Sequence, residues 1–243
     1  AGFIEALLQS GLDVINIGQV TTPALYFAIL HYQTDGGVMI TGSHNPIEFN
    51  GFKLNEGMSS IYGEDIQALR DIILANGFEQ RESGTEERMD VLPAYLNMLK
   101  SKFDFKKKLK IVVDAGNATA GPIAPQLWRD LGHEVIELYC EPDGRFPNHL
   151  PDPTVPKYMK DLQIEVLKHN ADVGLGYDGD SDRVGAVDDK GRLIFADTLM
   201  ALFSKGVLTK NPQAEIYFDV KCSMALPQQI KKYGGKPIMW KTG

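Results

Sequence analysis

Residues 109–117 read LKIVVDAGN, and this stretch decides the fold class of the chain. The apolar run predicts a β-strand, and the Gly-Asn pair after it predicts a turn. A helical pattern follows at 122–131, and EVIEL at 134–138 predicts another strand. A strand, a turn, a helix and a strand in this order are typical of layered α/β proteins with parallel or mixed sheets.

The same alternation continues towards the N-terminus. We expect strands at 13–18 and 37–41. Between them, Thr22 is predicted to be the N-cap of a helix and Pro23 its first residue. Residues 79–90 are highly charged and nearly free of apolar side chains, so they are the best candidate for a linker.

Towards the C-terminus the pattern also persists. Strands are expected at 172–177 and 184–187, on either side of an acidic loop. A third block of helices and strands begins near Leu193. The chain is therefore predicted to fold as three α/β blocks.

Composition limits the possible partners. The 243 residues carry a formal net charge of -7, which argues against general nucleic-acid binding because such proteins present basic faces. No apolar run is long enough to span a membrane, and no signal peptide is visible. Cys140 and Cys222 are expected to be buried thiols, which fits a reducing compartment. The chain starts inside a helical pattern and stops after a strand-like run, so we expect an internal piece of a longer protein.

A short polar loop, TGSHNP at 41–46, offers a hydroxyl group. Gly42 lets the backbone of Ser43 approach a ligand, and the residues after the serine force a turn. A serine needs a base or a metal to act as a nucleophile, and His44 and Lys53 are the nearby candidates. Taken alone, the loop is as typical of a plain turn with a surface histidine as it is of a reactive serine.

A second loop, DGDSDR, places Asp178, Asp180 and Asp182 at alternate positions, so their side chains face one side of an extended segment. Carboxylates held together favour Mg²⁺, Mn²⁺ or Ca²⁺ over zinc. An EF-hand would need glycine where Arg183 stands and glutamate where Asp189 stands. Together with the serine loop, this cation site is the equipment of a phosphoryl-transfer enzyme.

These motifs resemble the α-D-phosphohexomutase family. Residues 41–46 with 50–53 are similar to its phosphoserine loop, and residues 178–183 are similar to its metal loop. The Thr-Gly pair before the serine fits the bacterial phosphomannomutase/phosphoglucomutase branch better than the phosphoglucosamine mutases, which tend to have Ser-Ala. Further similarity to that branch lies at 114–117, 143–149, 218–222 and 239–243.

The resemblance implies four domains, of which the first three share an α/β core. By this resemblance residues 1–88 are the C-terminal part of domain 1 and residues 89–191 are domain 2 with the metal loop. Residues 192–243 would be the N-terminal part of domain 3, and domain 4 would be absent. We therefore expect α/β/α layers with mixed sheets, and little or no activity from 1–243 alone.

The resemblance also implies the chemistry. Hexose 6-phosphate and hexose 1-phosphate, of mannose and/or glucose, would be interconverted through a phosphoserine at Ser43 and a hexose 1,6-bisphosphate. Mg²⁺ would be held by Asp178, Asp180 and Asp182 together with Ser43. The partners would be small hexose phosphates, with no nucleic acid and no membrane, and the location would be cytoplasmic.

The remaining site residues follow from the same resemblance. Arg183 would hold phosphoryl oxygens. Lys53 and His44 are the candidates for proton transfer and charge stabilisation, and a lysine base would need a depressed pKa. Three further residues match positions near the sugar: Lys221, Thr242 and Gly243.

Other interpretations stay open. One is a phosphoglucosamine mutase, another a metal-dependent phosphohydrolase, and a third a non-catalytic homologue that binds phosphosugar. The retained serine, aspartates, arginine and lysine argue against the third. Some residues are expected to have no role at the site: surface or loop histidines His133, His149 and His169, a solvated linker at 106–108, and core side chains Trp128 and Trp240.

Overall fold

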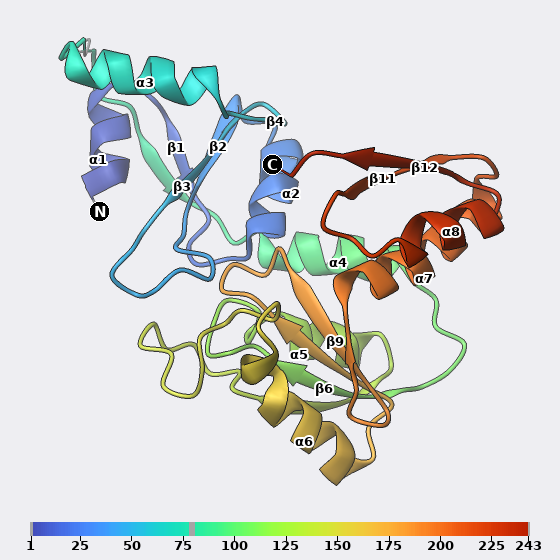
Figure 1. The fold of residues 1–243 in the computed structure, drawn as a ribbon. Helices are drawn as coiled ribbons and strands as arrows, with labels where there is room; N and C mark the ends of the chain where they lie inside the picture. Colours follow the sequence, from blue (N-terminus) through green and yellow to red (C-terminus); the bar gives the residue numbers. More distant parts are fainter. Residues whose placement is uncertain (1, 78–80, 243) are drawn as a thin grey trace.

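The computed structural model describes residues 2–77 and 81–242, whose elements form three groups along the chain (Figure 1). The first group, blue to cyan in Figure 1, precedes a central group in green to orange and a final group in red. The elements of the first group are α1 (Gly2–Gln9), β1 (Val14–Asn16), α2 (Thr22–Tyr32), β2 (Gly36–Ile40), β3 (Phe52–Glu56), β4 (Ser59–Ser60), α3 (Glu64–Leu74) and β5 (Glu86–Arg88).

The strands of the first group form two small sheets. β1 pairs in parallel with β5, whereas β2, β3 and β4 form an antiparallel sheet. Helix α2 packs against β2, and its buried Ala24 and Ala28 lie in one cluster with Met39 of that strand and with Val91 and Tyr95. The small alanines allow the helix to approach its neighbours closely.

The central group is built on a five-stranded mixed sheet. The strand order is β10-β9-β8-β6-β7, with β6 parallel to β7 and β8, and with β9 antiparallel to its neighbours. Its elements are α4 (Leu92–Lys102), β6 (Lys110–Asp114), α5 (Ala124–Asp130), β7 (Glu134–Leu138), η1 (Pro156–Met159), α6 (Lys160–His169), β8 (Val173–Tyr177), β9 (Val184–Asp188) and β10 (Leu193–Ile194).

Strand β6 is buried on both faces of this sheet. Val112 packs with Leu162 and Val166 of α6, while Ile111 and Val113 pack on the opposite face with residues of α5. Successive side chains of a strand point to opposite faces, so one apolar run supplies two cores. The predicted α/β class with layered, mixed sheets is confirmed.

The final group contains α7 (Ala196–Lys210), β11 (Glu215–Asp219), α8 (Ala225–Lys232) and β12 (Lys236–Trp240). β11 and β12 pair in parallel. Leu208, Phe218, Leu226 and Ile230 form their buried core. Two strands and two helices make a small unit with a correspondingly small core.

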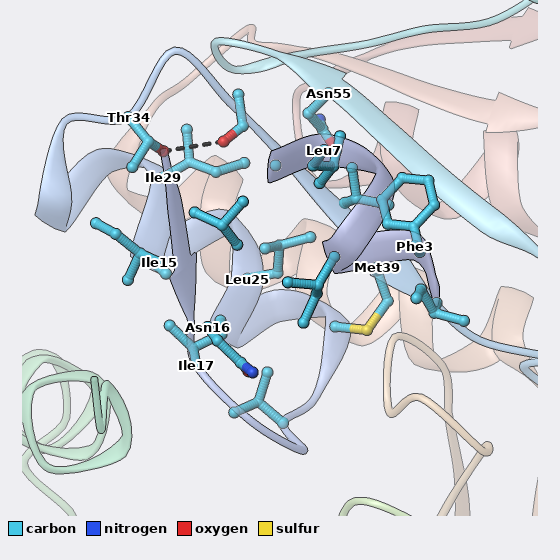
Figure 2. Close-up of a pocket in the computed structure, with 18 of the residues that line it drawn as sticks. Phe3, Leu7, Ile15, Asn16, Ile17, Leu25, Ile29, Thr34, Met39 and Asn55 are labelled. Carbon is cyan, nitrogen blue, oxygen red and sulfur yellow. Dashed lines mark hydrogen bonds between the residues drawn. The ribbon is translucent and has the colours of Figure 1, made fainter. Parts of the chain in front are cut away.

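A cavity of about 850 Å³ lies in the first group (Figure 2). It is lined by α1, β1, α2 and β2, with apolar side chains such as Phe3, Leu7 and Leu25. Within residues 2–77 and 81–242, β1 pairs only with β5, and β2 only with β3. Both strands that line the cavity therefore keep one edge without a strand partner in the described chain.

Some local predictions were wrong. Thr22 lies inside α2, and its N-cap is Thr21. The predicted linker contains β5, although residues 79 and 80 lie outside the described residues. His133 is buried, with 5% of its surface exposed, whereas Trp240 is 59% exposed and no core residue. No helix in the described part of the chain is long and apolar enough to cross a membrane.

Two other predictions concern a tryptophan of the central group and the two cysteines. Trp128 packs against the buried cluster on the α5 face of the sheet, as expected for a core residue. Cys140 and Cys222 are free thiols, but both are only partly buried. Burial raises the pKa of Cys140 to about 12, so this thiol stays protonated and unreactive near neutral pH.

Candidate active site

The acidic loop connects β8 to β9 at the carboxyl end of β8. Because β6 and β8 are parallel, the loops that follow them leave the sheet at the same edge. Thr119, in the loop after β6, donates a hydrogen bond from Oγ1 to the carbonyl oxygen of Gly179 at 2.9 Å. The acidic loop is thus held to the rigid sheet on one side.

Three carboxylates cluster on this loop. One oxygen each from Asp178, Asp180 and Asp182 lies within 4.8 Å of the others. Asp178 and Asp180 are buried, with 0% and 1% of their surface exposed. Oδ1 of Asp180 is buried and has no hydrogen-bond partner among the described residues. An unpartnered buried carboxylate oxygen is costly unless a cation meets it, so the donor set fits a hard divalent ion.

The serine loop follows β2, whose strand ends at Ile40. Ser43 has a backbone φ of 51°, a left-handed conformation that costs about 1–3 kcal/mol in a residue other than glycine. Its amide donates a hydrogen bond to Oγ1 of Thr41 at 2.8 Å, which stabilises this turn. The strained backbone directs the Ser43 hydroxyl away from its own sheet.

The two loops meet although 135 residues separate them in the sequence. Oγ of Ser43 donates a hydrogen bond to Oδ2 of Asp178 at 3.0 Å. The backbones also touch, because a Cβ added at Gly179 would lie 1.9 Å from the carbonyl oxygen of Ser43. Glycine is therefore required at 179 for this close approach. The pairing of Ser43 with the acidic loop matches the sequence hypothesis.

Three basic side chains surround the hydroxyl. Nζ of Lys53 lies 2.5 Å from Oδ2 of Asp180 and 2.7 Å from Oδ2 of Asp182. His44 places Nδ1 3.2 Å from Oγ of Ser43. Arg183 places Nη1 3.0 Å from the same ring nitrogen. The positive charges of Lys53 and Arg183 make this face of the loop pair suitable for an anionic group.

The acidic loop has unequal carboxyl groups. Burial raises the pKa of Asp178 to about 6, and the charges of Asp180 and Asp182 add to the rise. Burial alone would also raise the pKa of Asp180, but hydrogen bonds from Lys53 and Thr22 hold it below its ordinary value. Asp180 therefore stays charged near neutral pH.

The depressed pKa that a lysine base at position 53 would need is not found in this structure. Burial alone would lower the pKa of Lys53, but the hydrogen bonds and charges of Asp180 and Asp182 raise it above the ordinary value. A protonated ammonium has no lone pair with which to take a proton. In this arrangement Lys53 therefore lacks the free electron pair that a base requires.

Sequence reasoning missed one residue of the site. Thr22 is fully buried, and its Oγ1 donates a hydrogen bond to Oδ2 of Asp180 at 2.6 Å. A Thr-Pro pair is a local signal for a helix start, and nothing local announces a partner 158 residues away. The adjacent Thr21, which is the N-cap of α2, shows only that a second hydroxyl lies at this helix end.

The final group does not bring its predicted residues to this cluster. Lys221 is exposed, and its Nζ lies 3.9 Å from Oδ2 of Asp219. The side chain of Thr242 also hydrogen-bonds Asp219, which helps to lower the pKa of that carboxyl group. Gly243 lies outside the described residues. The sugar-binding roles of these three residues stay predictions.

The three histidines that were given no site role lie away from the cluster. His149 places Nε2 3.1 Å from Oδ2 of the buried Asp114 and Nδ1 2.9 Å from the carbonyl oxygen of Leu150. His169 contacts Glu165 one helical turn away. His133 accepts a hydrogen bond at Nδ1 from the amide of Leu109. All three stabilise the central group.

Layered α/β units that join a serine hydroxyl to a cluster of carboxylates and basic groups provide the arrangement that metal-assisted phosphoryl transfer needs. Two family models match the sequence. The model described as phosphoglucomutase/phosphomannomutase, alpha/beta/alpha domain I matches residues 1–80, and the domain II model matches residues 93–191. The chain belongs to the phosphoglucomutase/phosphomannomutase family.

Relatives with curated names support this membership. The chain is 48% identical over 240 residues to a phosphomannomutase/phosphoglucomutase of Pseudomonas aeruginosa, covering 99% of this chain and 52% of that protein. It is 44% identical to a phosphoglucomutase of Neisseria gonorrhoeae, with 98% and 52% covered. The chain thus spans about half the length of these relatives.

A solved structure gives the same result. A phosphoglucomutase/phosphomannomutase family protein from Burkholderia thailandensis matches with a TM-score of 0.93 and 40% sequence identity. The match covers 98% of this chain and 54% of that chain. The arrangement of all three groups is therefore shared with a known member of the family.

Proposed function

We propose that this chain is part of a phosphohexomutase that interconverts hexose 6-phosphate and hexose 1-phosphate, with mannose and/or glucose as the sugar. One observation carries the proposal: Oγ of Ser43 lies 3.0 Å from Oδ2 of Asp178, at the junction of two separate α/β units. The names of the relatives from Pseudomonas and Neisseria support the substrate class. Ser43 is the group that carries the phosphoryl.

The proposed reaction runs through phosphorylated Ser43. A hydroxyl of the hexose monophosphate attacks the phosphorus, a new O–P bond forms, the bond to Oγ breaks, and a hexose 1,6-bisphosphate results. The bisphosphate reverses its orientation in the cleft, and its other phosphoryl group returns to Oγ of Ser43. The transferring group is loosely bonded in the transition state, so charge stabilisation and alignment are what this chain supplies.

The neighbours of Ser43 divide this work. His44 is the better candidate for holding the proton, because its Nδ1 lies 3.2 Å from Oγ of Ser43 while Lys53 is a protonated ammonium. Lys53 and Arg183 stabilise negative charge on the phosphoryl oxygens, the arginine with a fixed fork of donors. His44, and not Lys53, is therefore the proposed proton-transfer residue.

Asp178, Asp180 and Asp182 would hold the cation together with an oxygen of the serine group. Their all-oxygen donor set and the unpartnered Oδ1 of Asp180 fit Mg²⁺. A bound Mg²⁺ supplies Lewis-acid stabilisation of charge on the transferring group.

The remaining parts of the proposal concern the whole protein. We propose the boundaries 1–88, 89–191 and 192–243 for its first three domains. Lys221, Thr242 and Gly243 are proposed to bind the sugar once the rest of the protein closes over the cleft. A cytoplasmic location and the absence of nucleic-acid partners complete the proposal.

The test is peptide mass spectrometry on the full-length protein, before and after brief exposure to mannose 1-phosphate and glucose 1-phosphate. We expect phosphate on Ser43 that is lost or exchanged only with Mg²⁺ present and not with EDTA. Ser43→Ala should abolish turnover, whereas Ser60→Ala, which removes an exposed hydroxyl from β4, should not.

Three outcomes would contradict the proposal. A Ser43 that never acquires phosphate, even with hexose 1,6-bisphosphate supplied, would favour a non-catalytic phosphosugar-binding protein. Release of inorganic phosphate in place of isomerised sugar would indicate a phosphohydrolase. Faster turnover of glucosamine 6-phosphate than of either hexose phosphate would move the assignment to a phosphoglucosamine mutase.

A further inference from the structure

Thr22 joins the first group to the acidic loop through two hydrogen bonds to one residue. Its Oγ1 donates to Oδ2 of Asp180 at 2.6 Å, and its amide donates to the carbonyl oxygen of Asp180 at 2.9 Å. The threonine is fully buried, and Asp180 is 1% exposed. Two bonds to the main chain and side chain of the same residue restrict both its position and its rotation.

The two carboxylate oxygens of Asp180 have unequal surroundings. Oδ2 accepts hydrogen bonds from Thr22 and from Lys53, whereas Oδ1 is buried without a partner among the described residues. A half-turn of the carboxylate only exchanges two equivalent oxygens, but any smaller rotation moves the accepting oxygen away from both donors. The two donors therefore fix the plane of the carboxylate and leave its other oxygen, here Oδ1, available to a cation.

Helix α2 adds to this effect through its own geometry. The first amides of a helix have no partner inside the helix, and the positive end of the helix dipole lies there. The amide of Thr22 is one of these groups, and the acidic loop supplies its acceptor. Threonine also has a stiff side-chain torsion, so its hydroxyl is aimed in advance.

We propose that Thr22 is a positioning residue that fixes the orientation of Asp180 and thereby presents Oδ1 as the cation ligand. The inference rests on the proposed function, because it assumes that the acidic loop binds a divalent cation. Cation affinity then depends on the seating of helix α2 against the loop. A residue of the serine-bearing unit thus controls the metal site of the other unit.

The test is direct titration of the full-length protein with Mn²⁺, followed by electron paramagnetic resonance, and with Mg²⁺ by calorimetry. Thr22→Val keeps the shape and removes the hydroxyl, whereas Thr22→Ser keeps the hydroxyl. Thr21→Val is the matched control, since Thr21 is buried at the same helix end and makes no capping hydrogen bond. Asp180→Asn gives the cation affinity that remains when the charge of the ligand is lost.

Loss of a group that orients a metal ligand costs about 10- to 100-fold in affinity. We expect Thr22→Val to weaken Mn²⁺ binding by about this factor, with Thr22→Ser and Thr21→Val close to wild type. If Thr22→Val does not fold, the Mn²⁺ affinity of Thr22→Ala tests the same expectation. The unfolding temperature of each apo protein, measured in parallel, separates lost positioning from lost stability.

Two results would overturn the inference. Unchanged Mn²⁺ affinity in Thr22→Val would leave the proposed metal site standing and remove the role of Thr22. Equal weakening in Thr22→Val, Thr22→Ser and Thr21→Val would show damage to the helix end, with no role for the hydroxyl. Absence of saturable Mn²⁺ binding in the wild-type protein is a different failure, because it contradicts the metal site itself.

Discussion

Replacing Gly179 by alanine should separate the two loops of the site. The added Cβ would lie 1.9 Å from the carbonyl oxygen of Ser43, a distance that real Cβ atoms essentially never show. The acidic loop has little room to retreat, because Thr119 holds the carbonyl oxygen of Gly179 from the sheet side and Pro151 packs 3.5 Å from the same added atom. The strain therefore falls on the serine loop.

The size of the effect follows from that contact. Ordinary van der Waals contact begins near 3.4 Å, so the carbonyl oxygen of Ser43 has to move by about 1.5 Å from its 1.9 Å separation. A misplacement of about 1 Å at a reacting group costs about 100-fold in rate. We expect Gly179→Ala to lower kcat by about 100-fold or more, since the 3.0 Å contact of Ser43 with Asp178 is lost with the shift.

The assay is phosphohexomutase turnover of the full-length protein at saturating hexose 1-phosphate, with hexose 1,6-bisphosphate as activator and excess Mg²⁺. Gly144→Ala is the matched control, because a methyl group added at Gly144 meets no heavy atom within 4 Å. Thermal unfolding of both variants shows whether the protein stays folded at the assay temperature.

Two results would refute the reasoning. A folded Gly179→Ala protein with wild-type kcat would mean that the loops tolerate separation, so the close approach has no part in turnover. An equal loss of kcat in Gly144→Ala would show that the effect is general to added methyl groups. A crystal structure of Gly179→Ala should show Ser43 displaced from Asp178.

Other charged groups allow three further predictions. Lys53→Met should lower kcat by about 100-fold and tighten Mn²⁺ binding, because the ammonium competes for Asp180 and Asp182; weaker Mn²⁺ binding would contradict this competition. Treatment with EDTA should abolish turnover, Mg²⁺ should restore it, and turnover that persists in EDTA would argue against the cation site. Burial alone would lower the pKa of His149, but Asp114 raises it above its ordinary value of 6.5. The protonated pair therefore stabilises the fold below about pH 6.5, and the benefit is lost as pH rises through the raised pKa. Urea unfolding should show that His149→Gln is about 1–3 kcal/mol less stable than wild type at about pH 6. The difference in the free energy of unfolding should be smaller at about pH 9. An equal difference at both pH values would refute the pairing.

The sequence predicted those parts of the fold that depend on local pattern. Strand β6 was recognisable because its apolar run is continuous, and continuity reflects burial on both faces. Strand β5 was missed because Glu86–Arg88 is charged and exposed, and because the strand with which it pairs in the described chain, β1, lies about 70 residues away. A short edge strand with charged side chains carries no alternating pattern to read.

The site was predictable to the same limited extent. The two loops bearing Ser43 and Asp178 could be recognised by their residue types and order. The docking of α2 on Asp180 could not, because the two hydrogen bonds of Thr22 arise only when separate units pack together. The pKa of Lys53 could not be read from the sequence for the same reason, since it depends on carboxylates more than 120 residues distant.

The free edges beside the large cavity of the first group bear on the behaviour of residues 1–243 as an isolated polypeptide. β1 and β2 present main-chain donors and acceptors on either side of an apolar space, and such edges accept any extended segment, including one from another copy. The solubility of this polypeptide then depends on these two strand edges and the apolar space between them. A proline placed on either strand edge would remove a main-chain donor and so limit pairing with another copy.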